Sequence, residues 1–246
     1  MVKAIQFHKA GRPSVIKWED VKLGKPKKGQ AQIRHTAIGL NYIDTYHRSG
    51  LYPLPMPSGL GTEGAGVVEA IGPGVKHVKP GDRVAYAGGV PGAYSEARNM
   101  DAGVLVKIPR GISDEAAAAM MLKGMTVEYL IRRTFPVKKG QTVLFHAAAG
   151  GVGLIAGQWL NALGVRAIGT AGSPAKVTLA KAHGYADVID YNKKDFVKEV
   201  ARLTKKEGVP VVFDSIGKST WEGSLDCLQP RGYMVSFGHA SGAVDS

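Results

Sequence analysis

One stretch of the sequence, from Ala147 to Leu154, contains eight consecutive residues without a polar side-chain atom. Three of the eight are glycines. The stretch follows the strand-like segment 142–146 and opens a segment with apolar residues at helical spacing. Small residues at such a turn allow backbone N–H groups and the helix N-terminus to approach a pyrophosphate. We therefore predict a loop that holds the pyrophosphate of a dinucleotide; a tight turn that binds no ligand is the alternative.

A second glycine pattern matches the literal dinucleotide motif G-x-G-x-x-G but lies in a different context. It runs from Gly59 to Gly64, follows a proline-rich loop and precedes the strand-like segment 65–72. The motif has its meaning only between a strand and a helix. We therefore predict that this segment is not a phosphate-binding loop.

The segment that would read the adenosine end of a dinucleotide is 169–176. NAD sites place an Asp or Glu about 20 residues after the glycine loop, against the ribose 2′-hydroxyl, and this segment contains no acid. Gly172 and Ser173 offer donors at a predicted helix N-terminus, and Lys176 offers a counter-charge. These residues predict a preference for NADPH over NADH. Tyr191 could flank the adenine or its phosphate, or simply pack at the end of a strand.

The two halves of the sequence have different patterns. Up to about residue 120, short β-branched runs alternate with proline and glycine turns, which predicts a mostly antiparallel β-rich domain. Residues 113–131 have a helical pattern with Ser113 as the N-cap. After residue 140, strand-like and helical segments alternate five times, which predicts a parallel sheet with helices on both faces. The predicted strands are 141–147, 166–171, 186–191, 209–217 and 232–238, and the predicted helices are 151–164, 173–184, 195–208 and a short one at 221–228.

The composition is that of an ordinary globular protein, with 44% hydrophobic and 21% charged residues. No stretch approaches the ~18 apolar residues of a membrane span, and the first residues lack a secretion signal, so we expect no membrane association and a cytoplasmic location. The single cysteine, Cys227, excludes an internal disulfide and a cysteine-built zinc site. The net charge of +12 comes from scattered basic residues, which predicts at most weak binding of polyanions or RNA.

The chain closely resembles the zinc-free NADPH:quinone oxidoreductases, the zeta-crystallin-like branch of the medium-chain dehydrogenase/reductase superfamily. The resemblance extends through essentially all of the sequence. It implies an α/β fold with a β-rich, GroES-like catalytic domain over residues 1–120 and a Rossmann domain with a doubly wound parallel sheet over residues 121–246. The stretches that carry it are "GLNYIDTYHRSGLYP", "PSGLGTEGAG", "KGMTVEYLIRRT", "FHAAAGGVGLIAGQW", "DSIGKSTWEGSLDCL" and "MVSFGHASGAV".

The positions of the superfamily's zinc ligands carry other residues in this chain. Zinc alcohol dehydrogenases have a metal-binding Cys where this sequence has Asn41, and a metal-binding His where it has Thr62. Their four-cysteine structural zinc loop has no counterpart here. Because Asn and Thr are poor zinc ligands compared with thiolate and imidazole, we expect no metal.

The resemblance implies a role for individual residues of this chain. NADPH is expected to contact residues from both halves, and Tyr46 and Tyr52 are expected at the mouth of the quinone site together with Asn41. By sequence pattern alone, these two tyrosines would be ordinary loop aromatics. The cofactor-binding residues implied by the resemblance are Asn41, Tyr42, Thr126, Ala149, Gly150, Gly151, Val152, Gly172, Ser173, Lys176, Tyr191, Ser215, Phe237, Gly238 and His239.

Members of the family continue beyond the point at which this sequence stops. The chain ends directly after the fifth predicted strand of the Rossmann domain, so we expect it to lack the usual last strand and the C-terminal segment that returns to the first domain. The family implies a homodimer that pairs through that last strand, and this ending puts the dimer in question. An exposed parallel edge strand also favours unwanted association.

The function predicted from these residues is the reduction of a quinone by NADPH without a metal, with hydride chemistry that belongs to the cofactor. A quinone is already electrophilic, so it needs a Lewis acid less than an aldehyde does. One alternative is an NADPH-dependent reductase of enones or 2-enoyl thioesters, which would need a proton donor near the nicotinamide. The alternatives from other classes are a nucleic-acid-binding protein and a crystallin-like structural protein, each binding NADPH.

Overall fold

The protein is described from a computed structural model, in which residues 1–244 are placed well enough to be described. The chain forms two compact units, Met1–Leu122 and Lys123–Ser246. The boundary between them falls inside one helix, α2 (Asp114–Glu128). None of the helices in the described part is both long and apolar enough to cross a membrane.

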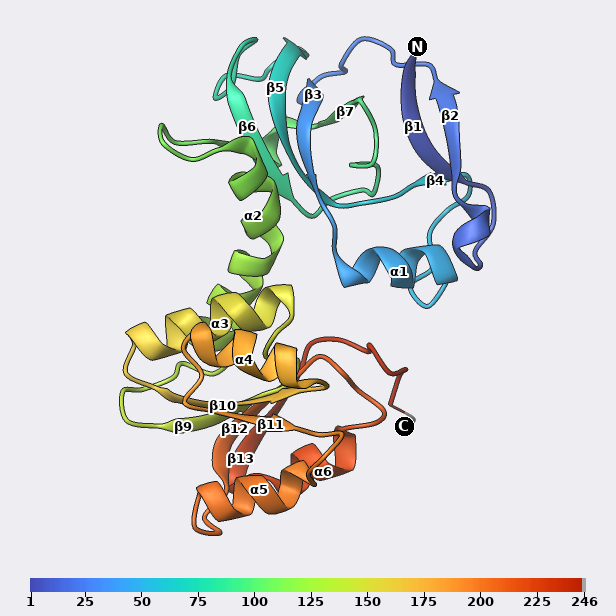
Figure 1. The fold of residues 1–246 in the computed structure, drawn as a ribbon. Helices are drawn as coiled ribbons and strands as arrows, with labels where there is room; N and C mark the ends of the chain where they lie inside the picture. The colour runs from blue at the N-terminus through green and yellow to red at the C-terminus, as the bar shows by residue number, and fades with distance from the viewer. Residues whose placement is uncertain (245–246) are drawn as a thin grey trace. The chain divides into compact units, whose positions relative to one another are not determined.

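The first unit contains two antiparallel sheets. The larger sheet has the strand order β7-β3-β5-β6-β8, and the smaller has the order β2-β1-β4 (Figure 1). Alanine, isoleucine, valine and tyrosine side chains of the larger sheet form a buried core with the segment after β7. This arrangement confirms the predicted β-rich first domain. Its strands are β1 (Val2–Phe7), β2 (Lys17–Val21), β3 (Gln30–Gly39), β4 (Ser58–Gly59), β5 (Glu63–Ile71), β6 (Arg83–Ala87), β7 (Ala97–Asp101) and β8 (Val106–Lys107).

One helix of the first unit, α1 (Tyr42–Ser49), was not predicted from the sequence pattern. Asn41 and Asp44 form a capping box at its start, and Gly50 ends it in the left-handed conformation with φ of 87°. Tyr46 therefore lies on a helix rather than in a loop, and it is buried. Two 3-10 turns, η1 (Pro13–Val15) and η2 (Ala102–Val104), complete the unit.

The second unit is a parallel sheet with the strand order β11-β10-β9-β12-β13. Helices α3 and α4 cover one face, and α5 and α6 cover the other (Figure 1). If the five strands are numbered by their place in the chain, their order across the sheet is 3-2-1-4-5, which is the doubly wound arrangement of dinucleotide-binding domains. The predicted alternation is confirmed. The strands are β9 (Thr142–Phe145), β10 (Arg166–Ala171), β11 (Asp187–Asp190), β12 (Val209–Asp214) and β13 (Leu228–Ser236), and the helices are α3 (Gly151–Ala162), α4 (Pro174–Ala182), α5 (Phe196–Leu203) and α6 (Trp221–Asp226).

The helix ends follow the capping residues of the sequence. Ser113 accepts a hydrogen bond from the backbone N–H of Ala116 at 3.1 Å, as predicted for an N-cap. Ser173 does the same for Lys176 at 3.3 Å, with Pro174 at the first helical position. The helix predicted over 113–131 is α-helical only to Glu128, because the following residues Tyr129–Thr134 (η3) widen into a π-helix. β13 begins four residues earlier than predicted, at Leu228.

Candidate functional site

The glycine loop lies between a strand and a helix, as the sequence predicts. β9 ends at Phe145, and α3 begins at Gly151 with Gly150 as its N-cap. Ala147 has φ of 51°, in the left-handed region that few non-glycine residues adopt, so the chain turns sharply there. By contrast, the segment Gly59–Gly64 leads from β4 into the strand β5. The prediction that this second motif is not a phosphate-binding loop is therefore consistent with its structural context.

The loop has no room for larger side chains. A Cβ atom on Gly153 would lie 2.7 Å from the carbonyl oxygen of Ala148 and closer still to that of Ala147. A Cβ on Gly151 would lie 2.8 Å from the Cδ of Lys123. The backbone N–H groups of the first turn of a helix have no acceptor within the helix and point out of its N-terminus. The loop is therefore a compact cradle of backbone donors, which suits the pyrophosphate of a dinucleotide.

The segment after β10 carries donors and a cation, and an aromatic ring packs against it. A Cβ on Gly172 would lie 2.7 Å from the Cζ of Tyr191, so the tyrosine ring, 54% exposed, packs directly on this glycine. Asn192, which the sequence analysis did not single out, donates to the carbonyl of Gly172 at 2.8 Å. The nearby carboxylate of Asp190 accepts from the backbone N–H of Asn192 at 3.1 Å. Ser173 and Lys176 therefore stand on a segment without an acid, whereas the carboxylate of Asp190 on the neighbouring strand is bound to the backbone of Asn192.

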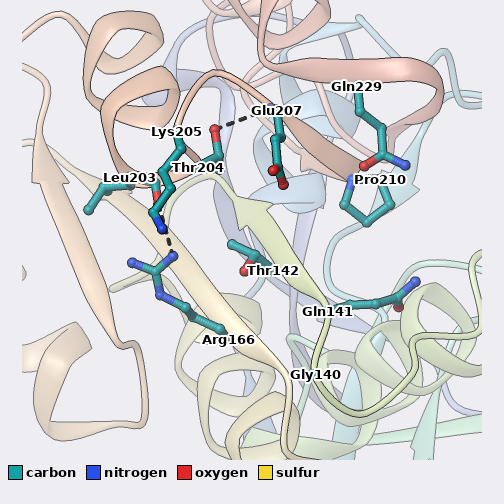
Figure 2. A pocket seen from close by; sticks show the side chains of 11 residues that line it. Gly140, Gln141, Thr142, Arg166, Leu203, Thr204, Lys205, Glu207, Pro210 and Gln229 are labelled. Atoms are coloured by element: carbon teal, nitrogen blue, oxygen red, sulfur yellow. Dashed lines mark hydrogen bonds between the residues drawn. The ribbon is translucent and has the colours of Figure 1, made fainter.

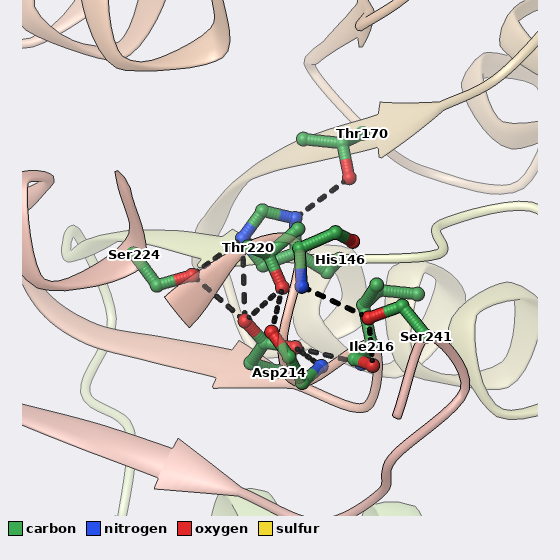
Figure 3. A network of polar contacts seen from close by, with 9 residues as sticks. His146, Thr170, Asp214, Ile216, Thr220, Ser224 and Ser241 are labelled. Carbon is green, nitrogen blue, oxygen red and sulfur yellow. Dashed lines mark hydrogen bonds and ion pairs between the residues drawn. The ribbon is translucent and has the colours of Figure 1, made fainter. Parts of the chain in front are cut away.

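A buried polar network lies at the carboxyl ends of β9, β10 and β12 (Figure 3). The ring of His146 is held between the hydroxyls of Thr170, at 2.8 Å from Nδ1, and Ser224, at 3.0 Å from Nε2. Ser224 and Thr220 donate to one oxygen of Asp214 at 2.8 and 2.7 Å. Because His146 and Asp214 directly precede Ala147 and Ser215, the network ties together the loops that are expected to hold the cofactor.

The second oxygen of Asp214 holds the loop that follows β12. It accepts from the backbone N–H groups of Ile216 at 2.7 Å and Gly217 at 3.1 Å. The loop after β13 lies against it, since the N–H of Ala240 donates to the carbonyl of Ser215 at 3.1 Å. The structure thus brings together Ser215 and the segment Phe237–His239, which the sequence analysis assigned to one site.

Burial decides the protonation state of this network. It lowers the pKa of His146 from 6.5 to about 4, although the charge of Asp214 acts in the opposite direction. Burial alone would raise the pKa of the Asp214 carboxyl, but the interaction with His146 and the hydrogen bonds from Thr220, Gly217 and Ser224 outweigh it and lower the pKa. At neutral pH the network therefore contains a neutral imidazole and an ionised carboxylate.

We expect the protein to lose stability as the pH falls from 6.5 toward about 4, the range set by the unfolded and folded pKa of His146. Below 6.5 the unfolded chain gains a proton at this residue that the folded chain excludes, so folding is penalised by up to about 3 kcal/mol. Urea denaturation at neutral pH and at about pH 5 measures the loss. His146→Gln should reduce the pH dependence, whereas His183→Gln, at the partly exposed C-cap of α4, should leave it unchanged. An equal pH dependence in wild type and His146→Gln would contradict the assignment.

The first unit contains a second buried polar cluster, at the start of α1. The side-chain amide of Asn41 donates to Glu63 Oε2 at 2.7 Å, and Glu63 Oε1 accepts from the backbone N–H of Leu122 at 2.8 Å. Glu63 is fully buried, and a Cβ on Gly39 would collide with its carboxylate. The sequence analysis noted Asn41 but missed Glu63, because a glutamate at the start of a strand has no local signal of burial.

Aromatic rings line up along α1. The rings of Tyr42 and Tyr46 lie 5.4 Å apart between centroids, and those of Tyr46 and Tyr52 lie 5.1 Å apart. Within the first unit, the three tyrosines therefore lie in contact, and Asn41 is the N-cap of α1, directly before Tyr42. Thr126, which is the predicted cofactor-binding residue on α2, belongs to the second unit.

Two residues of this chain stand at the positions of the superfamily's zinc ligands, and neither suits a metal. The side chain of Asn41 is bound to Glu63. Thr62, the residue directly before Glu63, is buried. Within residues 1–244, no group of three or more His, Cys, Asp or Glu side chains is arranged to hold a metal ion. The case against zinc rests on the identity of these two residues, whose side chains are weak ligands for it.

A cavity of about 450 Å³ in the second unit lies away from these loops (Figure 2). Its lining includes Thr142, Arg166 and Pro210, which stand at the amino ends of β9, β10 and β12. The guanidinium of Arg166 is already bound to Asp187 at 2.7 Å and to the carbonyl of Leu203 at 3.2 Å. Open α/β sheets bind their ligands at the carboxyl ends of the strands, so this cavity is not the cofactor site.

The two units and their sites define a medium-chain dehydrogenase/reductase. The family described as "Alcohol dehydrogenase GroES-like domain" matches residues 27–110, and the family described as "Zinc-binding dehydrogenase" matches residues 151–245. Within that superfamily, the chain belongs to the quinone oxidoreductases.

Two quinone oxidoreductases support this membership, and a third similar protein is a reductase of another name. A quinone oxidoreductase from Pseudomonas aeruginosa is 55% identical over 245 residues, which are 99% of this chain and 75% of that protein. The crystal structure of the Escherichia coli quinone oxidoreductase complexed with NADPH is 51% identical with a TM-score of 0.98, over 99% of this chain and 75% of that one. A 2-haloacrylate reductase from a Burkholderia species is 46% identical over 251 residues, 100% of this chain and 75% of that protein. The chain thus spans about three quarters of the length of these relatives.

Proposed function

We propose that the protein is a zinc-independent NADPH:quinone oxidoreductase. The observation that carries the proposal is the glycine-rich cradle without polar side chains at the start of α3, in a chain whose segment 169–176 has donors and a lysine but no acid. The membership of the chain in the quinone oxidoreductases and the NADPH-bound structure of the E. coli relative support it.

The residues of the second unit fit the two ends of NADPH. Ala149, Gly150, Gly151 and Val152 would hold the pyrophosphate with backbone donors, in a turn so tight that a Cβ on Gly153 would collide with its backbone. Lys176 and Ser173 would receive the 2′-phosphate at the N-terminus of α4, beside Tyr191. Thr126, Ser215, Phe237, Gly238 and His239 are proposed for the nicotinamide half. The cofactor, when bound, supplies the hydride.

The residues of the first unit are proposed to receive the quinone. Asn41 offers an amide that its bond to Glu63 holds in one orientation. The rings of Tyr42 and Tyr52 pack at steep angles on either side of the buried ring of Tyr46, and together they form an aromatic cluster. Such a cluster suits a flat, uncharged quinone ring, and the hydroxyls can donate to an oxygen that becomes negatively charged.

The first test is a fluorescence titration of the protein with NADPH and, separately, with NADH. We expect NADPH to bind roughly 10- to 150-fold more tightly, because a charged hydrogen bond to the 2′-phosphate contributes about 1.5–3 kcal/mol. Lys176→Met should weaken NADPH binding and leave NADH binding unchanged. Equal affinity of the wild type for the two cofactors would contradict the assignment of this segment.

A second candidate function is the reduction of an electron-poor carbon–carbon double bond by the same cofactor. The 46% identity with a 2-haloacrylate reductase favours it. Turnover of 1,4-benzoquinone and of 2-chloroacrylate, compared at equal NADPH concentration, separates the two functions. Faster turnover of the acrylate would make this the principal activity.

Three features of the sequence analysis stay predictions. These are the homodimer, which the family implies, the weak binding of polyanions or RNA, which the charge of +12 implies, and the cytoplasmic location.

A further inference from the structure

The cluster around Asn41 continues to a second carboxylate, Asp44, which the proposed roles leave unused. Asp44 Oδ2 accepts from the backbone N–H of Asn41 at 3.0 Å and from the hydroxyl of Tyr94 at 2.7 Å. The ring of Tyr94 packs on Gly61, where a Cβ would lie 2.6 Å from its Cε1. One oxygen of Asp44 is therefore held in place from two sides.

The other oxygen of Asp44 has no hydrogen-bond partner within residues 1–244, and neither has Nδ1 of His47. Asp44 is 4% exposed and His47 is 8% exposed, so both atoms are removed from solvent. The two residues lie three positions apart on α1, and that spacing places their side chains on the same face of a helix. A buried acceptor and a buried ring nitrogen without partners are costly unless they serve each other or a ligand.

The position of His47 connects this pair to the proposed quinone site. Its ring lies 6.2 Å from that of Tyr52 between centroids, in an edge-to-face arrangement. Tyr52 in turn contacts Tyr46. His47 thus contacts the tyrosine proposed at the mouth of the substrate site and lies on the face of α1 that carries Asp44.

Burial and a small set of neighbouring groups shift the pKa values of Asp44 and His47. Burial raises the pKa of Asp44, and Glu63 adds to this effect, whereas the hydrogen bonds from Tyr94 and Asn41 and the charge of His47 lower it. Burial lowers the pKa of His47, and the charge of Asp44 raises it. These groups come from α1, from β5 and from the segment before β7, and they couple the protonation of the two residues to each other.

We propose that Asp44 and His47 form a proton-delivering pair for the reduced substrate, in which the negative charge of Asp44 favours the imidazolium form of His47 and the imidazolium gives up a proton. The proposal rests on the proposed function. Hydride addition to a quinone leaves a hydroquinone anion, and the proton from His47 Nε2 completes the neutral hydroquinone. His47 then regains a proton from solvent, so that substrate, NADPH and one proton become reduced substrate and NADP+. On an electron-poor alkene the same proton would go to carbon.

The test compares Asp44→Asn, His47→Ala and Tyr94→Phe in the oxidation of NADPH by 1,4-benzoquinone, measured as kcat against pH. The kcat of the wild type should fall at alkaline pH as His47 loses its proton, and this fall forms the alkaline limb of the pH profile. Asp44→Asn should shift that limb to lower pH, because it removes the charge that raises the pKa of His47. His47→Ala should abolish the limb and lower kcat by roughly 10- to 100-fold, the range of a missing general acid. Added imidazole should restore part of the lost rate.

Tyr94→Phe is the matched control, because it removes one buried hydrogen bond from the same cluster but keeps both titrating groups. Its alkaline limb should move less than that of Asp44→Asn, because the carboxyl of Asp44 is still present. Thermal denaturation and NADPH titration of every variant separate a loss of folding from a loss of proton delivery. His8→Gln, at an exposed histidine bound to Glu19, should behave as wild type.

Two outcomes overturn the proposal in distinguishable ways. If wild type oxidises NADPH with the quinone while His47→Ala and Asp44→Asn keep kcat within about twofold and an unmoved limb, proton delivery by the pair is wrong and the proposed function stands. If wild type does not oxidise NADPH with the quinone, the proposed function fails and this inference fails with it.

Discussion

Gly153→Ala is expected to weaken NADPH binding by at least about 100-fold, which corresponds to about 2.7 kcal/mol. The new Cβ would lie 2.7 Å from the carbonyl oxygen of Ala148 and nearer to that of Ala147, and both obstructing atoms belong to the backbone. The loop cannot yield by rotating a side chain, so α3 must move away from β9 or the turn must open. Either change displaces the backbone donors proposed for the pyrophosphate. Fluorescence titration with NADPH measures the loss.

Two other glycines give graded controls for this experiment. In Gly151→Ala the obstruction is the flexible end of Lys123, so we expect a smaller loss of affinity. Gly124→Ala adds a Cβ that meets nothing within 4 Å in the middle of α2, and it should stabilise the fold by about 0.5–1 kcal/mol with unchanged affinity. Thermal denaturation shows whether Gly153→Ala is folded. Wild-type affinity in a folded Gly153→Ala protein would contradict the assignment of the cradle.

Asp214→Ala is expected to lower the free energy of unfolding by about 3–5 kcal/mol. The change removes the acceptor of four donors, the backbone N–H groups of Ile216 and Gly217 and the hydroxyls of Thr220 and Ser224. Ser224 also holds the ring of His146, so the loss extends to the residue directly before the cradle. NADPH affinity should fall as well. Urea denaturation and cofactor titration measure the two effects.

Asp214→Asn separates the two halves of this network. Its amide oxygen can still accept from the backbone of the loop after β12, and the hydroxyls of Thr220 and Ser224 can turn to accept from its NH2 group. We therefore expect an intermediate loss of stability. Asp226→Ala, at an exposed position at the end of α6, should change stability by no more than about 0.5 kcal/mol. An Asp214→Ala protein as stable as Asp226→Ala would show that the network does not hold the loops.

The start of α1 shows what the sequence analysis could have found and did not. Asn41 and Asp44 stand at the spacing of a capping box, and Gly50 stands where a helix ends, so the signals are local. The surrounding proline and glycine residues and the aromatic and β-branched content of "YIDTYHRS" favoured a loop. The consequence was that Tyr46 and Tyr52 were found only through the resemblance, and that His47 was not considered.

The sequence by itself determined the features that depend on neighbours in the chain. The cradle between β9 and α3, the cap at Ser173 and the absence of an acid between residues 169 and 176 are all set by short-range spacing and residue size. The alternation of strands and helices also fixes the parallel sheet, because right-handed crossovers leave few other arrangements.

Only the tertiary structure showed which distant residues share a buried environment. His146 and Ser224 are 78 positions apart, Asn41 and Glu63 are 22 apart, and Asp44 and Tyr94 are 50 apart. In the sequence each of these is a single polar residue, equally suited to a solvated surface. Their function depends on the loss of water around them, because burial is what lowers the pKa of His146, raises that of Asp44 and makes each hydrogen bond necessary. Burial is a property of the packed chain and has no counterpart in local sequence.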